Sequence, residues 1–255
     1  MTNTGAIKGK QHVGGIFGYG YCDSANSYLQ DSSNASAITA EAYVGAIAGQ
    51  LSNIAVNNCQ NTGSTLTATG YATADGIKYA YVGGFVGRGY LANNCTNDVE
   101  IKYSGGGRYV GGIIGYVGAL GTYAMGDLEN TANISGAEYV GGIFGGIVNQ
   151  SSNYSDFAVN LSELENTGAI SGSGNYVGGS AGYLAAGSNY SVTLYGTNLT
   201  NTGAIKGKLY VGGLFGYVKT DSTNSSVVEV VATGTVTATN NYGKRYGFAE
   251  NVKFE

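Results

Sequence analysis

One eight-residue motif occurs seven times along the chain, and this repetition limits the possible folds more than any other feature. The copies are HVGGIFGY, YVGAIAGQ, YVGGFVGR, YVGGIIGY, YVGGIFGG, YVGGSAGY and YVGGLFGY, at residues 12–19, 43–50, 81–88, 109–116, 139–146, 176–183 and 210–217. Their valines are separated by between 28 residues (Val82 to Val110) and 38 residues (Val44 to Val82). A unit of this length cannot bury its own apolar face, so neighbouring units must stack on one another.

A second block precedes most copies of the motif, as in LENTANISG (128–136), LENTGAISG (164–172) and LTNTGAIKG (199–207). Residues 2–10 repeat residues 200–208 letter for letter, so the chain opens within a repeat, as a fragment of a longer array would. A degenerate motif begins at residue 245, and we expect residues 240–255 to form an end cap. The whole chain, residues 1–255, is predicted to be a single repeat domain.

The composition favours β structure. The 255 residues include 45 Gly and 22 Tyr; Tyr, Val, Thr and Ile suit strands, whereas each Gly weakens a helix interior by roughly 0.5 to 1 kcal/mol. The predicted fold is therefore all-β, a parallel β-solenoid (β-helix-like) of about seven stacked repeats.

Stacking should align equivalent residues of successive repeats as ladders about 4.8 Å apart. We expect two core ladders, one of Leu29, Cys59, Cys95, Leu128, Leu164 and Leu199 and one of Ile134, Ile170 and Ile205. Asn130, Asn166 and Asn201 should form a buried ladder at a turn. Because Ile143 and Phe144 cannot both face the core from a flat strand, the motif should bend at its glycines.

The seven motifs resemble GLUG-motif repeats, short Gly-rich units of bacterial surface and secreted proteins that include adhesin-like proteins and some IgA-specific metallopeptidases. The resemblance covers nearly the whole chain, although the second copy departs from the pattern at Ala46 and Gln50, and the sixth at Ser180. It implies a repetitive extracellular β structure. It implies no catalytic residues, because the chemistry of those metallopeptidases belongs to a different domain.

The net charge and the longest uncharged run argue against two classes of partner, nucleic acid and membrane. A net charge of -4 gives no basic field to attract phosphates, so nucleic acid is not an expected partner. The uncharged run of residues 109–126 includes a copy of the motif and several glycines, so membrane insertion is not expected either. No cofactor and no metal site are predicted.

The three cysteines, Cys22, Cys59 and Cys95, are too few for a disulfide scaffold. Cys59 and Cys95 occupy matching contexts, NNCQN and NNCTN, where other repeats have Leu. We expect them to be small buried hydrophobic residues, with a disulfide or metal pair as the alternative.

Two patterns could indicate an enzyme. Ser180 lies in a G-x-S-x-G sequence, but no helix is expected after it and the sole histidine, His12, is five repeats away. Glu129 and Glu165 should stand on adjacent coils, where they could act as an acid/base pair or bind Ca²⁺. Solvated surface side chains are the simpler interpretation of these glutamates.

Two features could bind a ligand. A tyrosine column, formed by His12, Tyr43, Tyr81, Tyr109, Tyr139, Tyr176 and Tyr210, is expected to be a stacked structural ladder, with carbohydrate binding as the alternative. Residues 147–163 and 184–198 should emerge side by side as loops. The candidate ligand-binding residues there are Tyr154, Phe157, Tyr190 and Tyr195.

These features predict a non-enzymatic adhesive or structural segment of a bacterial surface protein, extracellular, that binds a host or matrix glycan or protein through loops on one face. The alternatives are a polysaccharide-active β-helix enzyme and a self-associating filament or stalk subunit, because solenoid ends expose strand edges. Five charges stand among the last twelve residues, so we expect the amino-terminal end to be the one that associates.

Overall fold

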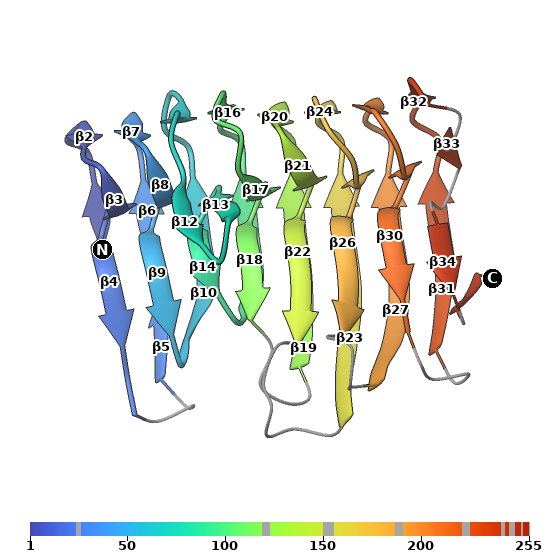
Figure 1. Ribbon diagram of the computed structural model, residues 1–255. Helices are drawn as coiled ribbons and strands as arrows, with labels where there is room; N and C mark the ends of the chain where they lie inside the picture. The colour runs from blue at the N-terminus through green and yellow to red at the C-terminus, as the bar shows by residue number, and fades with distance from the viewer. Residues whose placement is uncertain are drawn as a thin grey trace.

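The computed structural model describes residues 1–23, 27–118, 123–149, 156–186, 191–220, 225–240, 243–244, 248–250 and 252–254. These residues form strands and turns and no helix. Strands of successive repeats lie side by side along one axis, with the two termini at opposite ends (Figure 1). The all-β parallel solenoid predicted from the repeats is therefore confirmed.

Each complete coil contributes to all four sheets, which we name A to D in chain order, usually with one strand per sheet. Sheet A contains β1 (Thr2–Asn3), β5 (Ser27–Gln30), β6 (Ser33–Asn34), β10 (Ile54–Asn61), β15 (Ala92–Asn97), β19 (Tyr123–Asn130), β23 (Asp156–Asn166), β27 (Ser191–Asn201), β31 (Ser225–Ala232) and β35 (Val252–Phe254). Sheet B contains β2 (Ile7–Lys8), β7 (Ile38–Ala40), β11 (Leu66–Ala68), β16 (Ile101–Tyr103), β20 (Ile134–Gly136), β24 (Ile170–Gly172), β28 (Ile205–Gly207) and β32 (Val236–Ala238).

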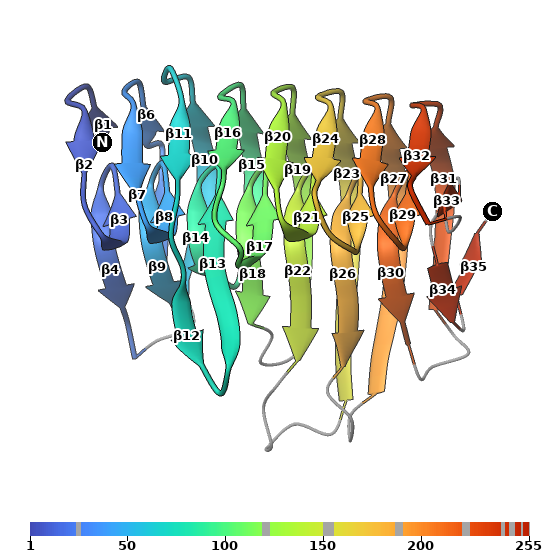
Figure 2. The ribbon, with the colours of Figure 1, turned by 45° about the horizontal axis from the view of Figure 1, so that its top comes forward.

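The repeated motif forms the other two sheets. Sheet C contains β3 (Gln11–Gly14), β8 (Ala42–Gly45), β12 (Ala72–Ala74), β13 (Ile77–Gly83), β17 (Arg108–Gly111), β21 (Glu138–Gly141), β25 (Val177–Gly178), β29 (Val211–Gly212) and β33 (Gly243–Lys244). Sheet D contains β4 (Phe17–Tyr21), β9 (Ala48–Ser52), β14 (Val86–Gly89), β18 (Ile114–Gly118), β22 (Phe144–Asn149), β26 (Ala181–Ala186), β30 (Phe215–Lys219) and β34 (Phe248–Glu250). Neighbouring coils pair in parallel, whereas β12 and β13 form an antiparallel hairpin within one coil (Figure 2).

The expected bend in the motif separates sheet C from sheet D. Ile143 and Phe144 are both fully buried, and the bend at residues 142–143 divides β21 from β22. The motif valines consequently enter one core, between sheets B and C, while Ile143 and Phe144 enter another, between sheets A and D. One motif thus supplies apolar side chains to two separate cores.

The asparagine ladder lies at the boundary between these two cores. Asn130, Asn166 and Asn201 are fully buried, as expected, and the ladder also includes Asn3, Asn34, Asn61 and Asn97. Asn130 Nδ2 donates to Asn166 Oδ1 at 2.7 Å, and Asn166 Nδ2 donates to Asn201 Oδ1 at 2.6 Å. Each of these amides also donates to a backbone carbonyl two residues later in its own turn. The chain therefore satisfies buried polar groups with an interior row of amides.

The core ladders agree with the expected registers except at one position. Ile134, Ile170 and Ile205 pair in sheet B, and Cys59, Cys95, Leu128, Leu164 and Leu199 pair in sheet A. Leu29, however, pairs with Val56 and not with Cys59. Ser32 takes the position next to Cys59, because Ser33 pairs with Gln60. The prediction that Leu29 belongs to the cysteine and leucine ladder was therefore wrong.

Candidate functional site

The outer face of sheet A carries two rows of polar side chains on either side of the buried leucine ladder. One row precedes the ladder residues and consists of Asn58, Asn94, Asp127, Glu163 and Asn198. The other row follows them and consists of Gln60, Thr96, Glu129, Glu165 and Thr200. Both rows run parallel to the solenoid axis, one residue per coil.

A bulge in each strand creates the first row. Met125 and Leu128 of β19 both enter the core although they are three residues apart. This spacing requires one additional residue in the strand, and Asp127 between them has a φ of 54°. The equivalent Asn94, Glu163 and Asn198 also have positive φ values, of 50°, 50° and 59°. Asn and Asp tolerate this left-handed region better than most residues, which explains their use here.

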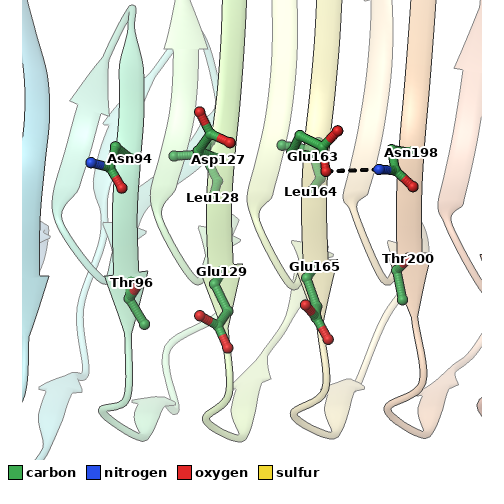
Figure 3. A pocket seen from close by; sticks show the side chains of 10 residues that line it. All are labelled: Asn94, Thr96, Asp127, Leu128, Glu129, Glu163, Leu164, Glu165, Asn198 and Thr200. Atoms are coloured by element: carbon green, nitrogen blue, oxygen red, sulfur yellow. Dashed lines mark hydrogen bonds between the residues drawn. The ribbon is translucent and has the colours of Figure 1, made fainter.

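The two rows line a groove of about 400 Å³ on this face (Figure 3). We call it the sheet A groove, and its lining residues are Asn94, Thr96, Asp127, Leu128, Glu129, Glu163, Leu164, Glu165, Asn198 and Thr200. Glu129 and Glu165 are in register on adjacent strands, as expected from the sequence. Asp127 and Glu163 add a second pair of acids, so four carboxylates face the same groove.

Hydrogen bonds order part of the groove. Asn198 Nδ2 donates to Glu163 Oε2 at 2.7 Å, and Asn94 Nδ2 donates to Asn58 Oδ1 at 2.8 Å. The groove therefore presents mainly hydrogen-bond acceptors on a rigid parallel sheet. Among the residues that the structure describes, no group of three or more His, Cys, Asp and Glu could hold a metal ion.

The structure places the four predicted ligand-binding residues unequally. Tyr154 and Tyr190 lie outside the described residues. Phe157 belongs to β23, opposite Val192, and its side chain lies outside the described part of the chain. Tyr195 belongs to β27, opposite Asn160, and its side chain is 42% exposed on the strand that also carries Asn198 and Thr200.

The expectation that residues 147–163 and 184–198 form loops was wrong for the described part of both segments. Residues 147–149 and 156–163 belong to β22 and β23, and residues 184–186 and 191–198 belong to β26 and β27. These strands pair with one another, so the two segments do lie side by side. The additional residues lengthen sheets A and D because their alternating apolar side chains, such as Val159, Leu161, Val192 and Leu194, extend the core.

The tyrosine column is a stacked ladder, as expected. The ring centroids of Tyr109 and Tyr139 are 4.9 Å apart, those of Tyr139 and Tyr176 are also 4.9 Å apart, and the ring planes lie within 16° of parallel in both pairs. A second set of tyrosines from sheet D, including Tyr116 and Tyr183, packs edge-on against the column. The inner rings use their faces to stack on each other, which leaves no face for a sugar.

Every residue of the column has a left-handed backbone, with φ between 50° at Tyr81 and 75° at Tyr109. The motif glycine in sheet D explains the close approach: a Cβ on Gly145 would lie 2.5 Å from the backbone nitrogen of Val110. Burial raises the pKa of Tyr116 and of Tyr139 to about 12. The column therefore stabilises the corner between sheets C and D.

Ser180 is buried, with 1% of its surface exposed, and its Oγ has no hydrogen-bond partner. It occupies the slot that Ile143 and Leu214 fill in neighbouring coils. The G-x-S-x-G sequence is thus part of the repeat and does not expose a nucleophile.

Sequence reasoning missed Asp127, Glu163 and Asn198 in the groove. The available signal was the acidic or amide residue before each ladder leucine, in DLEN, ELEN and NLTN. The hairpin of β12 and β13 lies in the longest interval between motif valines, from Val44 to Val82.

No protein-family model, no curated protein and no solved structure matches this chain. Within the described residues, no helix is long and apolar enough to cross a membrane.

Proposed function

We propose that this protein is a non-enzymatic repeat segment of a bacterial surface or secreted protein, and that its sheet A groove binds a glycan. The observation that carries the proposal is the pair of in-register polar rows beside the exposed ring of Tyr195. The likeness of the seven motifs to GLUG repeats supports the extracellular location and the adhesive or structural role.

The groove suits a glycan because its polar side chains recur once per coil, as sugar units recur along a glycan. Its carboxylate and amide oxygens recur at the coil spacing of about 4.8 Å and accept hydrogen bonds from hydroxyl groups. Tyr195 lies three residues before Asn198 on β27, roughly 10 Å along the strand, so its ring can contact a sugar bound at the end of the groove. A rigid sheet also lowers the conformational entropy lost on binding.

A glycan-array screen of the intact protein tests the proposal. We expect binding to a defined set of glycans that lack acidic sugars, because the carboxylates of Glu163 and Glu165 repel anionic sugars. Glu165→Lys and Tyr195→Ala should each reduce affinity at least about tenfold, a loss of roughly 1.4 kcal/mol. Ser171→Lys on the outer face of sheet B is the matched control, because Ser171 is exposed, is not part of the groove lining and pairs with a lysine, Lys206, in the next coil.

The control should bind as the parent protein does, and all three variants should keep the parent circular dichroism spectrum. Absence of any glycan ligand, or unchanged affinity in both groove variants, would contradict the proposal. Binding of a matrix protein through the same residues would instead assign a protein ligand to the groove.

One observation favours the polysaccharide-active enzyme as a second candidate: Asp127, Glu129, Glu163 and Glu165 all line one groove. Glycoside hydrolysis uses two carboxyl groups on opposite sides of the scissile bond. Incubating the protein with each bound glycan and measuring new reducing ends separates the two functions. Under our proposal the glycan is recovered intact, whereas cleavage that Glu129→Gln and Glu165→Gln abolish would establish the enzyme.

A further inference from the structure

Cys59 of β10 and Cys95 of β15 occupy the same register position on neighbouring strands of sheet A. Each side chain is 1% exposed and faces the core between sheets A and D. The next residues in this ladder are Leu128, Leu164 and Leu199. The two cysteines are therefore direct neighbours within an otherwise apolar row.

Their spacing suits a covalent bond. Adjacent parallel strands lie about 4.8 Å apart, and disulfides join Cα atoms separated by about 4.4 to 6.8 Å. Each Sγ contacts the backbone carbonyl two residues earlier in its own strand, Cys59 that of Asn57 and Cys95 that of Asn93, both at 3.2 Å, so the two side chains leave neighbouring strands in the same direction. Parallel side-chain directions and a short backbone separation are the two geometric requirements for bridging without a large backbone movement.

We propose that Cys59 and Cys95 are an oxidation site, at which a disulfide bond joins β10 covalently to β15. The inference concerns the scaffold and does not depend on glycan binding. It applies where the chain folds in an oxidising compartment that supplies small-molecule disulfides.

The chemistry is thiol–disulfide exchange with a disulfide oxidant such as oxidised glutathione. One cysteine loses its proton and attacks the oxidant, which breaks the S–S bond of the oxidant and releases one glutathione thiolate. The second cysteine, as its thiolate, then attacks the mixed disulfide, which forms the Cys59–Cys95 bond and releases the second glutathione thiolate. The two cysteines lose two protons and two electrons, and the oxidant gains both to become two thiols.

Burial determines when these steps occur. Both side chains are 1% exposed in the folded chain, so a disulfide oxidant cannot reach them there. The bond therefore forms while the coils assemble, before the core between sheets A and D closes over the pair.

The bond would join two residues that are 36 positions apart in the chain, 59 and 95, and would close a loop that contains the β12–β13 hairpin. This hairpin is the segment in which the chain leaves the regular coil path between two stacked strands. Closing such a loop removes conformational freedom from the unfolded chain and so favours the folded state.

Refolding experiments test the proposal directly. The intact protein is unfolded in urea with reductant and refolded at pH 8 with reduced and oxidised glutathione, and its remaining thiols are alkylated under denaturing conditions. We expect one alkylated cysteine, Cys22, and a peptide pair linked through Cys59 and Cys95 whose mass is lower by two hydrogens. The oxidised protein should melt roughly 5 °C or more above the reduced protein.

Two variants keep the test specific. Cys22→Ser should leave the bond intact, because Cys22 is outside this ladder. Cys59→Val should abolish it while preserving the fold, since Val230 is tolerated in the same row. Three alkylated cysteines after refolding, or a linkage that involves Cys22, would overturn the proposal. A lack of glycan binding would leave this result unaffected, so the two proposals fail independently.

Discussion

The side-chain amide of Asn166 lies so close to Gly142 that a Cβ atom on residue 142 would be 2.5 Å from both Cγ and Oδ1 of Asn166. The second motif glycine contacts an asparagine of the ladder in the same way at Gly84, Gly112 and Gly179. Sheet A and the turn between sheets C and D meet at this contact. It therefore divides the solenoid interior into its two cores, one between sheets A and D and the other between sheets B and C.

Replacing Gly142 with alanine should strongly destabilise the protein. The added methyl group would also lie 2.2 Å from the carbonyl oxygen of Gly179. It would therefore clash with a backbone carbonyl as well as with the side-chain amide of Asn166. Overpacking of this kind typically costs about 1 to 3 kcal/mol. Gly106→Ala is the matched control, because a Cβ there would have nothing within 4 Å. Chemical denaturation should show a lower free energy of unfolding for Gly142→Ala only. Equal free energies of unfolding for the two variants would contradict the close contact at Gly142.

Replacing Asn166 with alanine should cost about 1 to 3 kcal/mol, because it removes one amide from the middle of a buried ladder. The substitution removes one of the two acceptors of Asn130 Nδ2, whose bond to Ala132 O remains, and it removes the side-chain donor of Asn201 Oδ1. Asn3→Ala should cost less, since Asn3 is only half-buried and lies at the end of the ladder. Thermal and urea unfolding measure both variants, and an unchanged melting curve for Asn166→Ala would exclude an energetic role for the ladder.

Much of this fold could be predicted because the repeats carry their own register. The similar blocks around Asn130, Asn166 and Asn201 were expected to stack, and burial then followed for the side chains that face inward. Leu29 shows where the argument failed: the second coil has residues between Leu29 and Asn34 that shift the leucine by one inward position. A ladder assigned by residue type alone cannot detect such a shift.

The candidate site was harder to predict than the scaffold. Left-handed φ values at Asp127 and Glu163 determine which side chains face the groove. The three-residue spacing of Met125 and Leu128 accompanies the bulge, but it indicates one only once both residues are known to be buried in the same core. The long segments before Leu164 and Leu199 were interpreted as loops, yet their apolar residues alternate and extend the sheets. The prediction assumed that inserted residues leave the coil, whereas their described part pairs with the neighbouring coil as strand.

Alkaline pH should unfold the protein through its tyrosines. Burial raises the pKa of Tyr116 and of Tyr139 to about 12, and it also raises the pKa of Tyr81 and Tyr109. An unfolded tyrosine ionises near about pH 10. Because the folded state holds these protons more tightly than the unfolded state, the buried tyrosines contribute their full stabilisation below pH 10. This contribution is lost as the pH rises from 10 toward 12.

Absorbance at 295 nm reports tyrosinate, and circular dichroism reports the sheets during the same titration. We expect one class of tyrosines to ionise only as the circular dichroism signal of the strands disappears. In urea, all tyrosines should titrate together at about pH 10. Tyr116→Phe should move the alkaline transition to higher pH, since one ionisable group is removed from the buried set. Complete ionisation with an unchanged strand signal would contradict the packing of the column.

A chain of these 255 residues should associate with a second copy of itself through its first coil. Among the described residues, β1, β2, β3 and β4 are each the last strand of a sheet on this side, so their outer edges have no neighbouring strand. Phe17 is 39% exposed, whereas its counterparts Phe144 and Phe215 are fully buried, and Tyr19 and Tyr21 are exposed on the same strand, β4. Sedimentation velocity over increasing concentration should reveal dimers or larger species, because open strand edges and apolar side chains pair readily.

Phe17→Lys should shift the protein toward monomer, while Tyr195→Lys, an equally exposed aromatic position far from this end, should not. A strict monomer at high concentration, or equal effects of the two substitutions, would show that this end is already protected.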